Sequence, residues 1–359
     1  MTSAKSGKPR VLHVCSDTNI GGAGRYVLTL VTQPRIAARY EVAVACPDGA
    51  LAAALRRAGV PVFLYPGADR SLSWPAVQGL LALMRSWRPQ IVQAHGALSG
   101  RIAGRLAGAR VIYTKHGFAS AAEASVQIRE AGSLLRTLAV RHLADRIVAV
   151  SVAVRDALIA QGADPGRVRV IHGGVDTRSY EAAQPPVPGV VGALGRLERE
   201  KGFDVLIAAM AELRGEARLL IGGDGSQRAA LEAQAAGLPV DFVGFVSDVP
   251  AFLSRIGILA VPSRSEGLGL VAVEGMAAGR PVVASCTGGL SEVVAHGETG
   301  FLVEPEDPQA LAGAIRRLLA DPALAARMGA AGRARAAAQF SADRMAAETD
   351  ALYEELIAR

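Results

Sequence analysis

Short apolar runs alternate with longer amphipathic segments along the whole chain. In the first half, apolar runs predict strands at residues 11–15, 41–46, 61–65, 90–94, 110–114 and 146–150, with helices between them. The pattern restarts with residues 190–194 and continues through apolar runs at 219–221, 256–261 and 282–284. Strands that alternate with helices in this way are typical of parallel, doubly wound sheets. The sequence therefore predicts an α/β protein.

A break in this pattern separates the two halves of the chain. Residues 181–189 read EAAQPPVPG, a segment that is rich in proline and has no hydrophobic periodicity. A chain of 359 residues is also long enough to form two domains that each bury a core. We therefore expect one domain over 1–180, a second over 181–339, and a terminal helix over 340–359.

The stretch 262–284, PSRSEGLGLVAVEGMAAGRPVVA, links two of the predicted strands. Its glycines predict a turn, and the small residues that follow predict a helix from about Leu268 to Ala278. Gly279 is placed to close that helix, and Pro281 cannot continue it. The stretch therefore reads as the turn and helix of a βαβ unit.

Two carboxylates, Glu266 and Glu274, stand on either side of this predicted helix start. The unpaired N–H groups of Leu268–Val271 suit a phosphate, because the first amides of a helix have no intrahelical acceptor. Carboxylates repel a diphosphate but can bind sugar hydroxyls. The arrangement suits a nucleotide-sugar, with a hexose at Glu266, the diphosphate on the helix start and a ribose at Glu274.

The run from Glu266 through Glu274 resembles the paired-glutamate motif of retaining GT-B glycosyltransferases, in particular glycosyltransferase family 4 (glycosyl transferases group 1). Gly173 stands where the linker motif of that family usually has Asn, and both residues tolerate the left-handed turn. The resemblance covers nearly the whole chain. Segments similar to the family's other motifs are GGAG (21–24), TKHG (114–117), IHGGVD (171–176), GRLEREKG (195–202), GGDG (222–225) and VGFV (243–246).

The resemblance implies a GT-B fold, in which two Rossmann-like domains face a central cleft. The N-terminal domain would bind the acceptor and the C-terminal domain the nucleotide-sugar donor. The terminal helix at 340–359 would cross back onto the first domain.

The resemblance also implies the site residues. His116 would lie beside the reacting sugar, Glu266 would bind that sugar, and Arg196 and Lys201 would bind the donor phosphates; these four are the expected catalytic residues. The expected donor-binding residues are Gly21, Gly22, Gly24, Arg196, Lys201, Gly223, Phe245, Val246, Glu266, Gly267, Leu268, Gly269, Leu270, Val271 and Glu274.

The implied reaction is transfer of a sugar, with retention at the anomeric carbon, from a nucleotide-diphosphate donor to an acceptor hydroxyl. A UDP-sugar is the favoured donor, although the residues do not distinguish uracil from guanine. No DxD pair stands in a metal-binding context, so we expect the reaction to need neither metal nor cofactor. A GT-B sugar-nucleotide epimerase and a non-catalytic nucleotide-sugar-binding protein are the alternatives.

The net charge of +6 conceals an asymmetry between the halves. Residues 1–180 carry 23 Lys and Arg against 10 Asp and Glu, whereas the remainder carries 16 against 23. A basic half can face phosphorylated substrates, anionic lipid or nucleic acid. No aromatic-rich basic face accompanies the arginines, so nucleic acid is not expected. High arginine content from a GC-rich genome is an equal alternative.

The segment 121–146 places four arginines beside leucines, which is typical of a helix lying on an anionic membrane or of an ordinary core-facing helix. The latter is preferred. The basic half suggests a lipid-linked or cell-surface polysaccharide precursor as acceptor. The first apolar run is too short for a signal peptide, and Cys15, Cys46 and Cys286 form no CxxC pair. A cytoplasmic protein, with peripheral membrane contact as an option, is expected.

Overall fold

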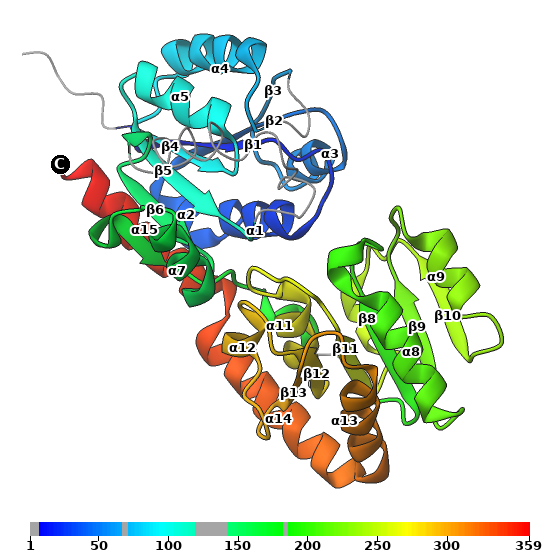
Figure 1. The fold of residues 1–359 in the computed structure, drawn as a ribbon. Coiled ribbons are helices and arrows are strands. Elements are labelled where there is room, and N and C mark those ends of the chain that lie inside the picture. Colours follow the sequence, from blue (N-terminus) through cyan, green and yellow to red (C-terminus); the bar gives the residue numbers. More distant parts are fainter. Residues whose placement is uncertain (1–6, 67–70, 119–141, 182–185) are drawn as a thin grey trace, which may run out of the picture. The chain divides into compact units, whose positions relative to one another are not determined.

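The computed structural model describes residues 7–66, 71–118, 142–181 and 186–359, which form two compact units (Figure 1). The first unit comprises Met1–Gly174 together with Ala342–Arg359, and the second comprises Val175–Ser341.

The first unit is built on a seven-stranded sheet in the order β3-β2-β1-β4-β5-β6-β7, and all its strand pairs are parallel. The six expected strands are confirmed to within one or two residues at their ends, and β7 is a further strand that was not expected. Their bounds are β1 (Arg10–Cys15), β2 (Glu41–Cys46), β3 (Val62–Leu64), β4 (Ile91–His95), β5 (Arg110–Lys115), β6 (Arg146–Ala149) and β7 (Val168–Val170).

Helices connect these parallel strands, as crossover connections require. On one face, Ala76, Leu80 and Met84 of the helix after β3 recur at helical spacing and pack into a buried cluster with Leu12 and Val92 of the sheet. The bounds are α1 (Gly22–Val31), α2 (Pro34–Arg39), α3 (Ala50–Arg57), α4 (Trp74–Trp87), α5 (Leu98–Leu106), α7 (Val152–Ala160), the 3₁₀ turn η2 (Pro165–Arg167) and α15 (Ala342–Ile357).

The second unit contains a six-stranded parallel sheet in the order β10-β9-β8-β11-β12-β13, which is the doubly wound order of Rossmann folds. The bounds of its strands are β8 (Val190–Leu194), β9 (Arg218–Gly222), β10 (Val240–Gly244), β11 (Ile258–Val261), β12 (Val282–Ser285) and β13 (Gly300–Val303). Its helices are α8 (Phe203–Leu213), α9 (Arg228–Gln234), α10 (Val249–Leu253), α11 (Leu270–Ala277), α12 (Leu290–Val293), α13 (Pro308–Ala320) and α14 (Pro322–Gln339), with 3₁₀ turns η3 (Thr177–Tyr180) and η4 (Arg199–Lys201).

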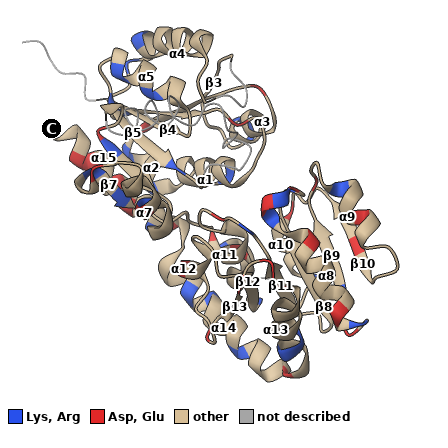
Figure 2. Cartoon of the chain, viewed as in Figure 1, with Lys and Arg blue, Asp and Glu red and all other residues tan. Residues whose placement is uncertain are grey.

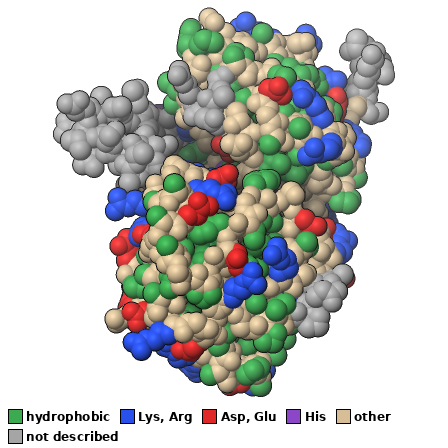
Figure 3. All heavy atoms as spheres, turned by 90° about the vertical axis from the view of Figure 1, so that its right-hand side faces the viewer, with side chains coloured by type: hydrophobic (Ala, Val, Ile, Leu, Met, Phe, Trp, Pro, Cys, Tyr) green, Lys and Arg blue, Asp and Glu red, His purple; other side chains and the backbone are tan. Residues whose placement is uncertain are grey.

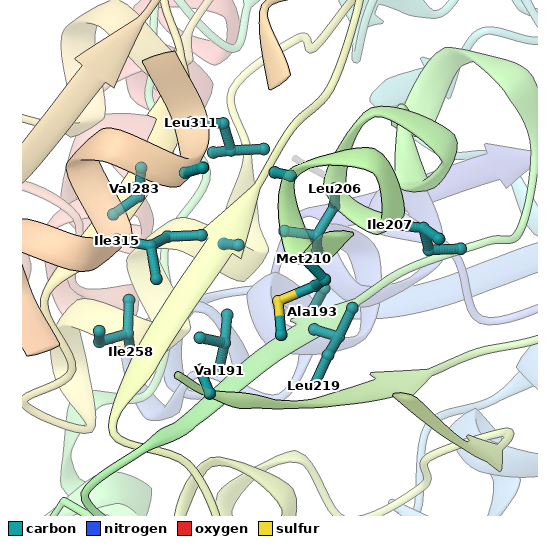
Figure 4. Packing of buried hydrophobic residues seen from close by; sticks show 14 of the residues in the cluster. Val191, Ala193, Leu206, Ile207, Met210, Leu219, Ile258, Val283, Leu311 and Ile315 are labelled. Carbon is teal, nitrogen blue, oxygen red and sulfur yellow. The ribbon is translucent and has the colours of Figure 1, made fainter. Parts of the chain in front are cut away.

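The core of the second unit lies between this sheet and two of its helices (Figure 4). Met210 of α8 and Ile315 of α13 are fully buried over Val191 and Leu219 of the strands. Burying one such side chain stabilises the fold by about 1.5–3 kcal/mol. The packing therefore holds the strand ends that carry the motifs at 195–202 and 262–269.

The C-terminal helix α15 belongs to the first unit, as expected for the GT-B fold. It packs against α1 and α2. Asp350 of α15 is 2% exposed and accepts hydrogen bonds from Arg39 at 2.6 Å and from the Tyr40 hydroxyl at 2.8 Å. This buried, fully partnered carboxylate fixes the end of the chain on the first sheet's helices.

The chain changes unit earlier than residue 181. The amide of Val175 donates to the Phe340 carbonyl at 2.9 Å, and Val175 forms a bridge with Ser341. Thr177–Tyr180 contacts α11 of the second unit. Because of these contacts, the second unit begins at Val175 and ends at Ser341.

The predicted basic helix over 121–146 lies mostly outside the described residues. Within the described part, Arg146 is the first residue of β6, is 8% exposed and pairs with Glu355 of α15. The assignment of Arg146 to that helix is therefore wrong, because the residue begins a strand. Its side chain holds α15 against the first unit through Glu355.

Charged side chains of both signs occur in both units (Figure 2). On the face seen in Figure 3, they are interspersed with apolar side chains. None of the helices in the described ranges combines the length and hydropathy needed to cross a membrane.

Candidate functional site

The order of the second sheet reverses between β8 and β11. In open α/β sheets, ligands bind outside the carboxyl ends of the strands at such a reversal. The segments that leave these two strands are 195–202 after β8 and 262–269 after β11. Two of the expected donor motifs therefore start at this point.

Lys201 and Glu266 meet there, although 65 residues separate them in the sequence. Nζ of Lys201 lies 2.5 Å from Oε2 of Glu266, and the side chains are 21% and 15% exposed. The Ser263 hydroxyl donates to the same carboxylate oxygen at 3.3 Å. With Val271, these residues line a cavity of about 20 Å³. The structure thus brings a cation and a carboxylate together at the edge where a ligand is expected.

Arg196, the second expected phosphate-binding cation, is placed differently. Its side chain is 65% exposed, and Nη2 lies 2.7 Å from Oε1 of Glu200. An exposed pair of this kind contributes only about 0.2–1 kcal/mol. Little energy therefore holds the guanidinium on Glu200, and a phosphate can compete for it.

Helix α11 begins at Leu270, two residues after the expected start at about Leu268. Gly269 takes φ 90° and ψ 56° at the N-cap, a left-handed conformation that ends the preceding turn and delays the helix. Among the described residues, the amides of Leu270 and Val271 have no hydrogen-bond acceptor, while Ala272 donates to the Gly269 carbonyl at 2.9 Å. The amides of Leu270 and Val271 are therefore open to an acceptor at the start of α11, and Leu268 is 3% exposed.

The other expected donor-binding residues of the second unit follow strands of the same sheet or lie on α11. Glu274 lies on the second turn of α11 and is 6% exposed. Phe245 and Val246 follow the carboxyl end of β10, and the Phe245 ring is 72% exposed. Gly223 follows β9 with φ 140°, and a Cβ atom there would lie 1.8 Å from the Gly195 carbonyl oxygen. Only glycine permits the loops after β8 and β9 to approach so closely.

The glycine loop of the first unit joins β1 to α1. Gly21 is the N-cap of α1, and its carbonyl accepts from the amide of Arg25 at 2.9 Å. A Cβ atom at Gly21 or Gly22 would meet no atom within 4 Å, so these positions leave open space beside the loop. Gly24 is different, because a Cβ atom there would lie 3.0 Å from the Asn19 carbonyl oxygen.

His116, just beyond β5, is the end of a row of three histidines in the first unit. The register pairs Cys15 with His95 and His95 with Thr114, so His13, His95 and His116 lie diagonally on one face of the sheet. His13 Nδ1 lies 3.0 Å from His95 Nε2, and His95 Nδ1 lies 2.9 Å from His116 Nε2. The Tyr26 ring packs edge-on against His116, with centroids 4.8 Å apart.

Burial keeps these imidazoles uncharged. It lowers the pKa of His13 to about 3 and, together with the neighbouring histidines, lowers the pKa of His95 well below its usual value. Burial, aided by Lys115, lowers the pKa of His116 to about 3. At neutral pH each ring is therefore one hydrogen-bond donor and one acceptor.

The free energy of unfolding of the first unit is expected to fall as the pH is lowered below about 6.5. In the unfolded chain these three histidines are protonated near pH 6.5, whereas in the folded unit His13 and His116 are protonated only near pH 3 and the pKa of His95 is also well below 6.5. The unfolded state therefore binds more protons between these values. Each histidine contributes a slope of about 1.4 kcal/mol per pH unit. Urea unfolding at pH 7.5 and 5.5 would measure this free energy of unfolding. The fluorescence of Trp74 and Trp87 would report the transition, since both residues lie in the first unit. A flat profile would contradict neutral burial, and His13→Gln should reduce the slope by about one third.

Neither His13 nor His95 was among the expected site residues. A signal was present: Gln93 and His95 occupy alternate positions in the otherwise apolar strand β4, and the same two-residue step separates Thr114 of β5 from His116 just beyond it. Alternation places such residues on one face. Ser263, three residues before Glu266, was also missed.

Within the described ranges, no group of three or more His, Cys, Asp or Glu side chains is arranged to hold a metal ion. A second hollow, about 350 Å³, is lined by Val190 and Arg218. These residues stand at the amino ends of β8 and β9, the edge opposite the one at which such sheets bind ligands.

Comparison with known proteins agrees with this geometry. Residues 20–179 match the family described as Glycosyltransferase Family 4, and residues 181–335 match the family described as Glycosyl transferases group 1. The chain belongs to the family 4 glycosyltransferases.

Two curated relatives and one solved structure illustrate the similarity. D-inositol 3-phosphate glycosyltransferase of Acidothermus cellulolyticus is 36% identical over 274 residues, which span 66% of this chain and 61% of the relative. Glycogen synthase of Mycobacterium tuberculosis is 36% identical over 294 residues, which span 75% of this chain and 69% of the relative. The crystal structure of Anabaena Alr3699/HepE in complex with UDP-glucose superposes with a TM-score of 0.85 at 25% identity, over 96% of this chain and 99% of the other. The expected GT-B fold is thereby confirmed.

Proposed function

We propose that this protein is a retaining glycosyltransferase that transfers a sugar from a nucleotide-diphosphate donor, with a UDP-sugar favoured, to an acceptor hydroxyl. The observation that carries the proposal is the contact between Lys201 and Glu266 at the sheet reversal. Beside it, α11 presents the amides of Leu270 and Val271.

The chemistry requires stabilisation of the departing diphosphate, on which negative charge develops. Lys201, Arg196 and the amides at the start of α11 are donors suited to that charge. In this proposal they act without a metal ion or cofactor. Glu266 accepts a hydrogen bond from a hydroxyl of the transferred sugar, and Glu274 accepts one from a hydroxyl of the ribose.

The acceptor hydroxyl attacks the anomeric carbon from the face that the diphosphate leaves. The new glycosidic bond forms as the bond to the leaving phosphate oxygen breaks, and that oxygen takes the acceptor proton. His116 is uncharged at neutral pH and supports the sugar by a hydrogen bond rather than by charge.

Two further parts of the proposal concern the substrates. The printed description of the Anabaena protein names UDP-glucose as its ligand, which supports a UDP-sugar here. The basic charge of residues 1–180 supports an anionic acceptor, such as a lipid-linked or cell-surface polysaccharide precursor, and a cytoplasmic enzyme that meets it at the membrane surface.

Thermal unfolding with UDP-, GDP- and ADP-sugars tests the donor. A ligand present at 100 times its Kd stabilises the folded state by about 2.7 kcal/mol, so the correct nucleotide should raise Tm of the second unit by several degrees. We expect the largest shift with a UDP-sugar. No shift with any nucleotide-sugar, at concentrations up to the millimolar range, would contradict the donor assignment.

A further inference from the structure

The row of histidines does not end at His13 but continues to the C-terminal helix. His13 Nε2 lies 3.3 Å from the hydroxyl of Tyr353 on α15. That hydroxyl also contacts Oε1 of Gln93, whose Nε2 donates to the Thr114 hydroxyl at 2.8 Å. Tyr353 is 0% exposed, and His13 and Gln93 are equally buried. A hydrogen-bonded chain thus joins the end of the polypeptide to His116.

The direction of the protons in this chain follows from one group. A phenol has a single proton to donate. The hydroxyl of Tyr353 gives it to the carbonyl oxygen of Gln93, which is the closer of its two partners. Its oxygen can then only accept from His13. His13 must therefore carry its proton on Nε2.

The same logic passes along the row. A neutral imidazole has one N–H, so His13 Nδ1 is an acceptor and receives the Nε2 proton of His95. His95 Nδ1 in turn receives the Nε2 proton of His116. The Nδ1 atom of His116 is left without a proton, and no side chain or backbone group in the described ranges donates to it.

We propose that Tyr353 and Gln93, acting through His13 and His95, are positioning residues that hold His116 in its Nε2–H tautomer and present its bare Nδ1 as an acceptor for a substrate hydroxyl. The role of His116 Nδ1 as an acceptor for a substrate hydroxyl rests on the proposed function, whereas the tautomer of His116 does not. The chain of bonds makes α15 part of the functional site, in addition to its role in packing.

The surroundings keep this arrangement in place. His13 and His95 stack with ring centroids 5.3 Å apart, as do His95 and His116 at 5.2 Å. The Tyr26 ring packs against the rings of both His95 and His116. Stacked and edge-packed rings cannot rotate without disturbing the core, so a change of tautomer is the main freedom that Tyr353 must remove.

Histidine-selective ¹⁵N labelling of the full-length protein tests the tautomer directly. Long-range ¹H–¹⁵N correlation spectra at pH 7 distinguish protonated from bare ring nitrogens. We expect protonated Nε2 and bare Nδ1 in His13, His95 and His116. A proton on Nδ1 of His116 would mean that the Gln93 amide is reversed and the chain runs in the opposite direction, and would overturn the proposal.

Tyr353→Phe removes the hydroxyl and keeps the ring. We expect the His116 signals to move toward a mixture of tautomers, and kcat to fall by about tenfold, the equivalent of one lost hydrogen bond. The KM for the nucleotide-sugar should change less than twofold. Unchanged His116 signals together with unchanged kcat would overturn the proposal.

Tyr40→Phe is the matched control. Tyr40 packs edge-on against Tyr353, with centroids 5.2 Å apart, and its hydroxyl bonds Asp350 rather than the histidine row. It should lose a similar amount of stability while keeping the His116 spectrum and kcat. If no nucleotide-sugar is turned over but the spectra show Nε2–H in all three rings, the proposed function fails and the tautomer assignment stands.

Discussion

Replacing Lys201 by methionine is expected to lower kcat by about 10²–10³-fold, the usual cost of removing one donor that meets charge developing in the transition state. Methionine keeps most of the volume of the lysine stem beside Val271 and removes the ammonium group. The amides of Leu270 and Val271 remain, so the variant should retain part of its affinity for the diphosphate. The affinity for UDP, measured by calorimetry, should fall as well.

A matched control separates this effect from a general loss of charge. Arg327 is an exposed cation on α14, in the same unit. Arg327→Met removes one positive charge from the second unit and should leave both kcat and UDP affinity unchanged. If Lys201→Met bound UDP as tightly as the unchanged protein, Lys201 would have no place on the diphosphate.

Most of the fold could be predicted because its signals are local, although the strands β7, β10 and β13 were not expected. Apolar runs of four to six residues at regular spacing indicate parallel strands regardless of what they later contact. The doubly wound sheets followed from the alternation of strands and helices, whereas the return of α15 came from the family resemblance, and both are found in the structure. The start of α11 was placed two residues early because Leu268 and Leu270, on either side of Gly269, fit a helix equally well. Only the left-handed φ at Gly269 determines where the helix begins.

The candidate site was predictable as a set of residues but not as a set of contacts. Motifs named Lys201 and Glu266 separately, and the sequence carries no sign that they pair, because the contact depends on the reversal between β8 and β11. Under the proposed function their pairing has a consequence: a diphosphate would compete with the Glu266 carboxylate for the Lys201 ammonium.

The histidine row was missed for a related reason. His13, His95 and His116 lie on three strands, and their contacts depend on a register that places each ring two residues out of step with its neighbour. Tyr353 lies 340 residues from His13. A pattern that is local in the sequence cannot report such a distant contact.

Replacing Glu266 by glutamine is expected to separate sugar recognition from diphosphate binding. The substitution keeps the size of the side chain and one carbonyl acceptor but removes the charge. A hydrogen bond to a charged group is worth about 1.5–3 kcal/mol, so turnover of the nucleotide-sugar should fall by about ten- to a hundredfold.

The affinity for UDP should not fall in this variant. Without the carboxylate 2.5 Å away, the Lys201 ammonium loses its competing partner and becomes more available to the diphosphate. Glu266→Gln should therefore bind UDP as tightly as the unchanged protein or more tightly, which is the opposite of Lys201→Met. The double variant should lose less turnover than the product of the two single losses, because residues in contact do not act additively.

The control for charge is Glu304→Gln, at an exposed position just after β13 in the same unit. It should change neither turnover nor affinity. Undiminished turnover in Glu266→Gln would remove this carboxylate from the sugar site. Weaker UDP binding in Glu266→Gln would instead show that the carboxylate acts by holding Lys201 and Ser263 in place. Loss of a sugar contact alone would leave the contacts of Lys201 and the α11 amides with the nucleotide unchanged.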